Sequence, residues 1–188
     1  MDAAHTVMEH LRGVATGDVE LAGRVLHPAN VNHMAADEPP ACARPGLPGL
    51  MATSAWLPLA FTDLTFELIE CTADDGKVMA HVWMRGRQTG PFVVFPPGAR
   101  PVAFPPTGRT FAVRHGHIFH LRDGRFAEHI AVRDDLGMMT QLGHLPPPHG
   151  IGRMIRWRIS GEHSRAVRRA VQIAQEAADA AARTAPVA

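Results

Sequence analysis

The chain has 188 residues, a net charge of +1 at neutral pH and two cysteines. This length fits one domain with an appendage, which can bury a core without disulfides or metals. The balanced charge argues against a nucleic-acid-binding protein. The cysteine count indicates a reducing cytoplasm rather than a disulfide framework or zinc site. No apolar run approaches the ~20 residues that span a bilayer. The charged N-terminus does not have the pattern of a signal peptide.

The N-terminal third predicts helices, because apolar residues recur there at intervals of three and four. The expected ranges are 6–14, 19–26 and 47–61. Gly17 and Asp18 between the first two should form a turn and an N-cap. Pro58 should kink the third helix or end it near Leu57. Residues 31–33 are expected to be a short segment that leads into a proline-rich loop.

The middle of the chain alternates like strands, at residues 64–69, 78–85, 110–121 and 126–133. The loop 122–125, with Asp123-Gly124, predicts a hairpin between the last two. Both faces of the strand 78–85 are apolar, so it should be central and covered on both sides. Residues 96–107 are predicted to be a proline-rich connection. Helices followed by an antiparallel meander indicate an α+β fold, with the helices on one face of a curved sheet.

Three prolines at 146–148 mark a predicted boundary between a domain at 1–145 and a linker with a helical extension at 146–188. Residues 162–183 are predicted to form a helix whose apolar stripe is Val167, Ala170, Val171 and Ala174. Its charge is local and mixed. We therefore expect the helix to pack along the domain or a partner, rather than to bind nucleic acid.

Asp134 is the main catalytic candidate, because a carboxylate at the end of an apolar strand is costly unless compensated. If the hairpin closes at 122–125, residue 117 pairs with 130 and residue 113 with 134. Asp134 would then lie on the same side as Ile130 and Val132, in an apolar pocket that raises its pKa towards that of a general base. The alternative is an N-cap for the helix-like residues 135–142.

Three histidines are candidate partners of substrate. His115 and His117 lie on one strand face by the period of two, and His117 could donate to the substrate or contact Asp134. The alternative for His117 is a satisfied core histidine, and for His33 a structural loop role. The His-x-His pattern lacks a third ligand at a suitable spacing, so no metal is expected.

Six short motifs occur in an order that resembles the SnoaL-like polyketide (ester) cyclase family. They are Asn32-His33, residues 61–64, residues 86–92, Pro105-Pro106-Thr107-Gly108-Arg109, His117-Ile118-Phe119 and the segment 124–143. The resemblance implies a cone-shaped fold of the ketosteroid-isomerase or nuclear transport factor 2-like kind, with a deep pocket between sheet and helices. It also implies that Asp134 is the acid/base. Ile130 stands where the family usually has tryptophan, and Arg87-Gln88 replaces Thr-His.

The predicted function is a cofactor-independent ring closure or isomerisation of a hydrophobic, polyketide-like carbonyl compound. Asp134 and His117 are the predicted catalytic residues. The predicted substrate-binding residues are His33, His115, Asn32, Trp56, Trp83, Ile130 and Phe92. The alternatives are a non-catalytic binding or dimerisation module, and an epoxide hydrolase or hydratase with an Asp–Arg–Asp set that uses Arg85 or Arg114. The resemblance implies a homodimer that forms through the sheet, and neither nucleic-acid nor membrane partners are expected.

Overall fold

The computed structural model describes residues 2–145 and 151–184. Its helices are α1 (Ala3–Thr16), α2 (Val19–Val25), α3 (Leu47–Ala60), α4 (Asp135–Gln141), α5 (Ile151–Ile159) and α6 (Glu162–Thr184), with short 3-10 turns η1 (His33–Asp37) and η2 (Pro40–Ala43). Its strands are β1 (Leu26–Asn32), β2 (Phe61–Ala73), β3 (Lys77–Gln88), β4 (Phe92–Val94), β5 (Val102–Phe104), β6 (Thr110–Arg122) and β7 (Arg125–Arg133).

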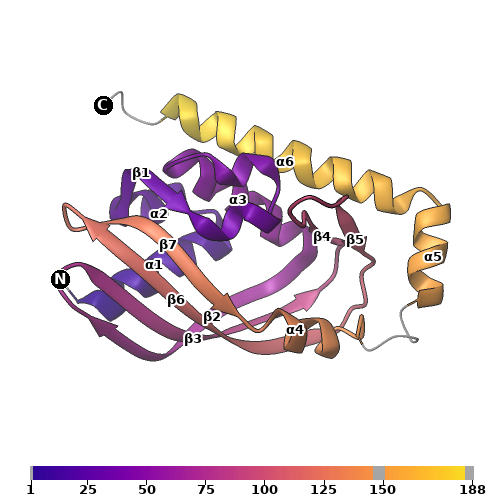
Figure 1. Cartoon of the computed structure of the whole chain (residues 1–188), viewed down its shortest axis with the longest axis horizontal. Helices are drawn as coiled ribbons and strands as arrows, with labels where there is room; N and C mark the ends of the chain where they lie inside the picture. The colour runs from indigo at the N-terminus through magenta and orange to yellow at the C-terminus, as the bar shows by residue number, and fades with distance from the viewer. Residues whose placement is uncertain (1, 146–150, 185–188) are drawn as a thin grey trace.

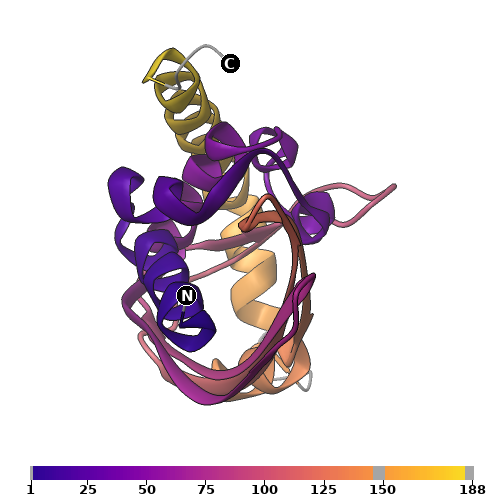
Figure 2. The same ribbon diagram turned by 90° about the vertical axis from the view of Figure 1, so that its left-hand side faces the viewer.

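The main sheet has the order β1-β7-β6-β3-β2, in which β1 runs parallel to β7 and the other neighbours are antiparallel. Figure 2 shows the sheet curving around α1, with the helices on its concave side. The long α6 lies outside α3, on the side away from the sheet (Figure 1). The predicted α+β architecture, with helices packed on one face of a curved sheet, is confirmed.

Local signals explain most of the helix boundaries. Gly17 ends α1 in a left-handed conformation (φ 72°), and the Asp18 side chain caps α2 by accepting from the Leu21 N–H. Pro58 does not end α3 as expected. The proline removes only its own N–H, and the last turn persists because the Phe61 N–H donates to the Leu57 carbonyl.

The elements β1, β4, β5 and α5 were not predicted from the sequence. β1 holds the edge of the sheet next to β7, where Asn30 Nδ2 donates to the Phe126 carbonyl at 2.9 Å. Pro28 is tolerated in β1 because an edge strand leaves some N–H groups unpaired. The connection after Phe92 contains the hairpin β4–β5, and α5 precedes α6.

The strand β3 is covered on one face only by the part of the chain that the structure describes, so the expectation of cover on both sides is wrong for the single chain. Val78, Ala80 and Val82 point into the core, whereas Met79 and Trp83 point to the convex face. Trp83 lies there between the guanidinium groups of Arg85 and Arg114, at 5.0 and 4.8 Å from its ring. The apolar residues on this outer face therefore meet solvent or a second chain.

The C-terminal helix packs mainly through alanine: Ala170 and Ala174 of the predicted stripe are buried and Val167 is partly buried, whereas Val171 is not part of the packed face. Its buried residues are Ala166, Ala170, Ala174, Ala178 and Ala181, while Val171 is 38% exposed. Small side chains every four residues let α6 approach α3 closely, and Arg44 Nη1 donates to Asp179 Oδ1 on α6 at 2.5 Å. The boundary predicted at Pro146–Pro148 lies outside the described residues.

We predict that a chain truncated before Ile151 still folds but is less stable. The alanine stripe buries little apolar area. Because each Å² of buried apolar surface contributes only about 25 cal/mol to stability, the loss of this stripe should cost little. Its loss would also uncover α3, which is apolar all round. Thermal melting should show a cooperative transition at a lower Tm than the full chain. An insoluble or non-cooperative product would mean that α6 belongs to the folding core and that 1–145 is not a domain.

Candidate functional site

A cavity of about 360 Å³ lies between the concave face of the sheet and the helices α1 and α3. Its wall is mainly apolar and aromatic, with Trp56, Phe61, Phe66, Phe92 and Phe104 among the lining residues. Polar groups reach it from η1, β6 and β7, where they form two sets. One set is built from histidines, and the other surrounds Arg133.

The pairing of β6 with β7 decides which side chains enter this cavity. His117 pairs with Ala131 and His115 with Arg133, because the register shifts between His120 and Leu121 next to the hairpin. The predicted pairing of 117 with 130 is therefore wrong by one residue. Since side chains alternate along a strand, one residue of slip exchanges the two faces of β7.

Asp134 consequently does not line the cavity. Its side chain is exposed and caps α4 by accepting from the Gly137 N–H at 2.8 Å. A Cβ at residue 137 would lie 2.2 Å from Asp134 Oδ2, which explains why glycine follows at this spacing. The structure thus gives Asp134 the capping role, and it offers no geometric support for a catalytic one.

A chain of hydrogen bonds links β1, β7 and β6 at the base of the cavity. Asn32 Oδ1 lies 3.0 Å from His129 Nδ1, and His129 Nε2 lies 3.0 Å from His117 Nδ1. The Met34 N–H also donates to Asn32 Oδ1, at 3.1 Å, and this fixes which end of the amide is oxygen. His117 Nε2 is buried without a hydrogen-bond partner.

Burial keeps these imidazoles neutral. Desolvation lowers the pKa of His129 to about 3 and lowers the pKa of His117 well below its ordinary value, and the neighbouring histidines add to the effect. Burial also lowers the pKa of His10 and of His115 to about 4 each. His10 Nδ1 and His115 Nε2 are buried without partners, as His117 Nε2 is.

Glu38 is the one cavity carboxyl that is nearly inaccessible to solvent, with its side chain 5% exposed. Burial raises its pKa to about 7, although the Thr53 hydroxyl donates to Oε2 at 2.7 Å and Arg133 Nη1 lies 4.0 Å from Oε1. A carboxyl that titrates near neutral pH in an apolar cavity has the properties of a general acid or base.

Arg133 organises the second polar set at the rim of the cavity. Its Nη2 donates to Asp37 Oδ2 at 2.5 Å, and its Nε lies 3.3 Å from Asp135 Oδ2. Asp135 lines the cavity because of the register slip, although its side chain is 51% exposed. In the described part of the chain, no group of three His, Cys, Asp or Glu side chains is arranged to hold a metal ion.

The other predicted site residues divide into two groups. Asn32, Trp56, Phe92, His115 and His117 line the cavity. His33, Trp83 and Ile130 do not.

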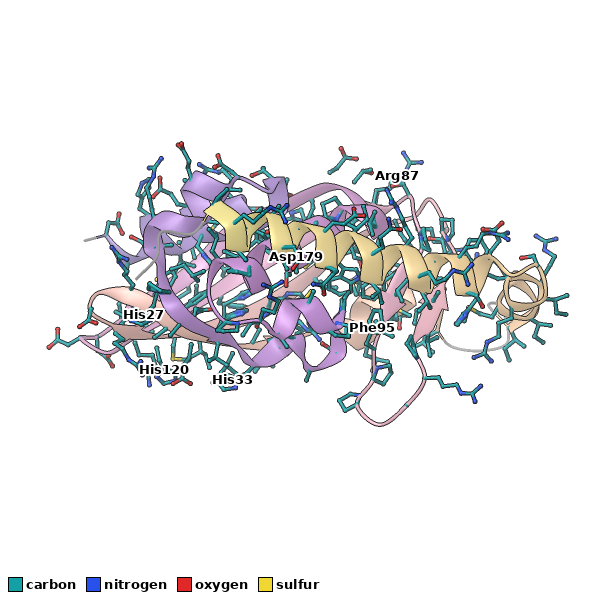
Figure 3. All side chains as sticks on the ribbon, turned by 90° about the horizontal axis from the view of Figure 1, so that it is seen from above. His27, His33, Arg87, Phe95, His120 and Asp179 are labelled. Atoms are coloured by element: carbon teal, nitrogen blue, oxygen red, sulfur yellow. The ribbon has the colours of Figure 1, made fainter. Side chains whose placement is uncertain are left out.

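Their positions explain the division. His33 is 48% exposed, pairs with Glu128 at 3.0 Å and points outward at the edge of the molecule (Figure 3). Trp83 and Ile130 belong to the outer face of the sheet, since their neighbours Val82 and Ala131 point inward.

Similarity to known proteins identifies the family of this chain. The sequence profile of the SnoaL-like polyketide cyclases matches residues 5–142. The chain belongs to the SnoaL-like polyketide cyclase family. A search of curated proteins finds no match.

Solved structures agree with this membership. TsrD from Streptomyces laurentii is 30% identical, with a TM-score of 0.61 over 76% of this chain and 96% of its own. IdmH from Streptomyces antibioticus, a proposed polyketide cyclase, is 25% identical, with a TM-score of 0.59 over 76% and 99%. A Catenulispora acidiphila protein with a ketosteroid isomerase-like fold is 13% identical and has a TM-score of 0.53 over 75% and 93%, which supports the fold alone.

These structures leave about a quarter of this SnoaL-like chain uncovered, although nearly all of their own length is matched. The family profile match ends at residue 142, before α5 and α6. No described helix is both long and apolar enough to cross a membrane.

Buried neutral histidines make the stability of this fold sensitive to acid. His10 has an ordinary pKa of 6.5 that burial lowers to about 4, so between these values the unfolded chain binds a proton that the folded chain does not. We predict that stability falls as the pH drops from 6.5 to 4. His10 alone accounts for a loss on the order of 2 kcal/mol between pH 7 and 5.

The variant His10→Leu should show a smaller fall in Tm between pH 7 and 5 than the unmodified protein. His120→Leu, which changes the outer face of the sheet, serves as the matched control and should keep the original slope. Equal slopes in all three proteins would show that His10 is not held neutral by burial.

Proposed function

We propose that this protein catalyses a cofactor-independent, acid/base ring closure or isomerisation of a hydrophobic, polyketide-like carbonyl compound, with Glu38 as the base. The observation that carries this proposal is a buried carboxyl with a pKa of about 7 in an aromatic cavity. Membership of the SnoaL-like family supports the substrate class. The catalytic step assigned to Asp134 from sequence passes in this proposal to Glu38.

The chemistry follows from the surroundings of Glu38. The Thr53 hydroxyl donates to Oε2, and in this proposal Oε1, which lies 4.0 Å from Arg133 Nη1, removes a proton from a carbon next to a carbonyl. The substrate's own conjugation spreads the charge of the resulting enolate, and the guanidinium of Arg133 lies close enough to stabilise it further. The enolate attacks a second carbonyl held in reach by the aromatic walls, and Glu38 returns its proton to the new alkoxide.

The proposal predicts that the protein accelerates hydrogen–deuterium exchange at the α-carbon of 2-tetralone, a bicyclic ketone of suitable shape, as followed by proton NMR in D₂O. Glu38→Gln should lower the exchange rate by about 10²–10⁴-fold, because it removes the base and keeps the shape of the side chain. Asp134→Asn is the matched control and should retain the rate, since asparagine caps a helix as well as aspartate does.

The pH dependence provides a second test. The rate should rise as the pH increases through about 7, because only the deprotonated form of Glu38 accepts a proton. If Asp134→Asn loses the rate and Glu38→Gln keeps it, the base is Asp134 and the assignment to Glu38 is wrong. If the unmodified protein produces no exchange at all, the protein is a binding module rather than an enzyme of this kind.

A second candidate function rests on the set Asp37–Arg133–Asp135. The sequence suggested that a hydratase or epoxide hydrolase would need an aspartate–arginine–aspartate set, and the structure supplies one through Arg133 rather than through Arg85 or Arg114. Such a set could activate water for attack on an epoxide. If Asp37→Asn loses the hydrolysis of styrene oxide and Glu38→Gln keeps it, the result favours a hydratase or epoxide hydrolase.

We further propose a homodimer in the cytoplasm, formed through the convex face of the sheet. Met79, Ile69 and Val132 are 41%, 43% and 71% exposed on the sheet, and Trp83 adds an aromatic surface next to them. Burial of this patch against a second copy would be favourable. Light scattering should give twice the chain mass, and Val132→Glu should shift it towards the monomer.

A further inference from the structure

The hydrogen-bond chain under the cavity fixes the protonation state of His117. An amide oxygen only accepts, so Asn32 Oδ1 requires a proton on His129 Nδ1. His129 is neutral, so its Nε2 then carries a lone pair and must accept from His117 Nδ1. His117 is also neutral, which leaves Nε2 without a proton. Each step follows from the one before it, and the Met34 N–H anchors the whole chain by orienting the Asn32 amide.

We infer that His117 is a fixed hydrogen-bond acceptor, and that the cavity therefore selects a neutral substrate with a hydroxyl or enol group that donates to His117 Nε2. This reverses the donor role expected from sequence. The inference rests on the cavity being the substrate site of the proposed function.

The surroundings of His117 support a donor ligand of low charge. Nε2 is buried and unpartnered, an arrangement that costs free energy until a donor arrives. His10 and His115 line the same cavity, and His10 Nδ1 and His115 Nε2 are likewise buried without partners. A carboxylate brings no proton for these nitrogens, and the nearby cation, Arg133, is already paired with Asp37 and Asp135.

Asn32 is a positioning residue in this scheme. It lies behind His129 and acts on His117 only by fixing the two tautomers. It was expected to bind substrate directly. An amide serves here better than a carboxylate, because a carboxylate would favour a charged His129.

The first test needs no ligand and no turnover. Long-range proton–nitrogen NMR spectra of the ¹⁵N-labelled protein should show His117 and His129 as neutral rings protonated at Nδ1. His117→Phe and His129→Phe assign the signals. In Asn32→Leu, we expect the tautomers of both rings to become mixed. A ring of His117 protonated at Nε2 in the unmodified protein would overturn the inference.

The second test compares 2-naphthol, 2-methoxynaphthalene and 2-naphthoate by calorimetric titration. The unmodified protein should bind the naphthol roughly tenfold more tightly than the ether, as expected for one buried hydrogen bond. This preference should disappear in His117→Phe and persist in His120→Phe, which alters the other face of the same strand. Tightest binding of the naphthoate, or an unchanged preference in His117→Phe, would contradict the inference.

The two tests are separable from the proposed function. If Glu38→Gln retains exchange of 2-tetralone while His117 is protonated at Nδ1, Glu38 is not the base, but the acceptor role of His117 is supported. If Glu38→Gln loses exchange while His117 carries its proton at Nε2, Glu38 is supported as the base, and the inferred preference for a hydroxyl or enol donor is wrong.

Discussion

The register of the β6–β7 hairpin is the constraint on which the site depends. A shift between His120 and Leu121 places Ala131 opposite His117, and from there every second residue of β7 faces the cavity. His129 and Arg133 enter it for this reason, whereas Val132 is 71% exposed. One residue added or removed at this hairpin would exchange the two faces and dismantle both polar sets at once.

Desolvation acts on both kinds of titratable group in this cavity, with opposite signs. It raises the pKa of the carboxyl of Glu38 and lowers the pKa of the imidazoles of His10, His115 and His129, because in each case the uncharged form is favoured. Arg133 keeps its charge, but two aspartates compensate it. The buried histidines therefore add no charge to the interior near pH 7. Such an interior suits a substrate whose charge appears only during the reaction.

Much of the fold could be predicted from the sequence, but only part of the site could. Periodicity and caps predicted α1, α2, α6 and the four long strands, because these depend on local patterns. β1 pairs with the distant strand β7, and β4 and β5 pair with each other across a proline-containing connection, so proline-rich sequence was a misleading guide. The register of β7 depends on a bulge between His120 and Leu121, and no residue in 122–125 indicates that bulge.

Glu38 illustrates what sequence reasoning missed. It lies between Asp37 and Pro39 in a loop, where a carboxylate is ordinarily a solvated charge. Its burial is produced by α3, which brings Thr53 to its carboxyl, and by β7, which brings Arg133. The only local signal was an acidic pair followed by two prolines, in a segment otherwise rich in small apolar residues. Asp135 was missed for the different reason that strand parity was counted from the wrong pairing.

The helix α3 lies between the cavity and the C-terminal helix α6. Its residues are apolar on all sides. One side contributes Leu50, Trp56 and Leu57 to the cavity, and α6 packs on α3 through its alanine stripe. None of the described residues that line the cavity comes from α5 or α6. The helix α6 can therefore influence the site through the elements that it packs against. These are α3, which carries Thr53, the strands β4 and β5, and Arg44, which lines the cavity and donates to Asp179.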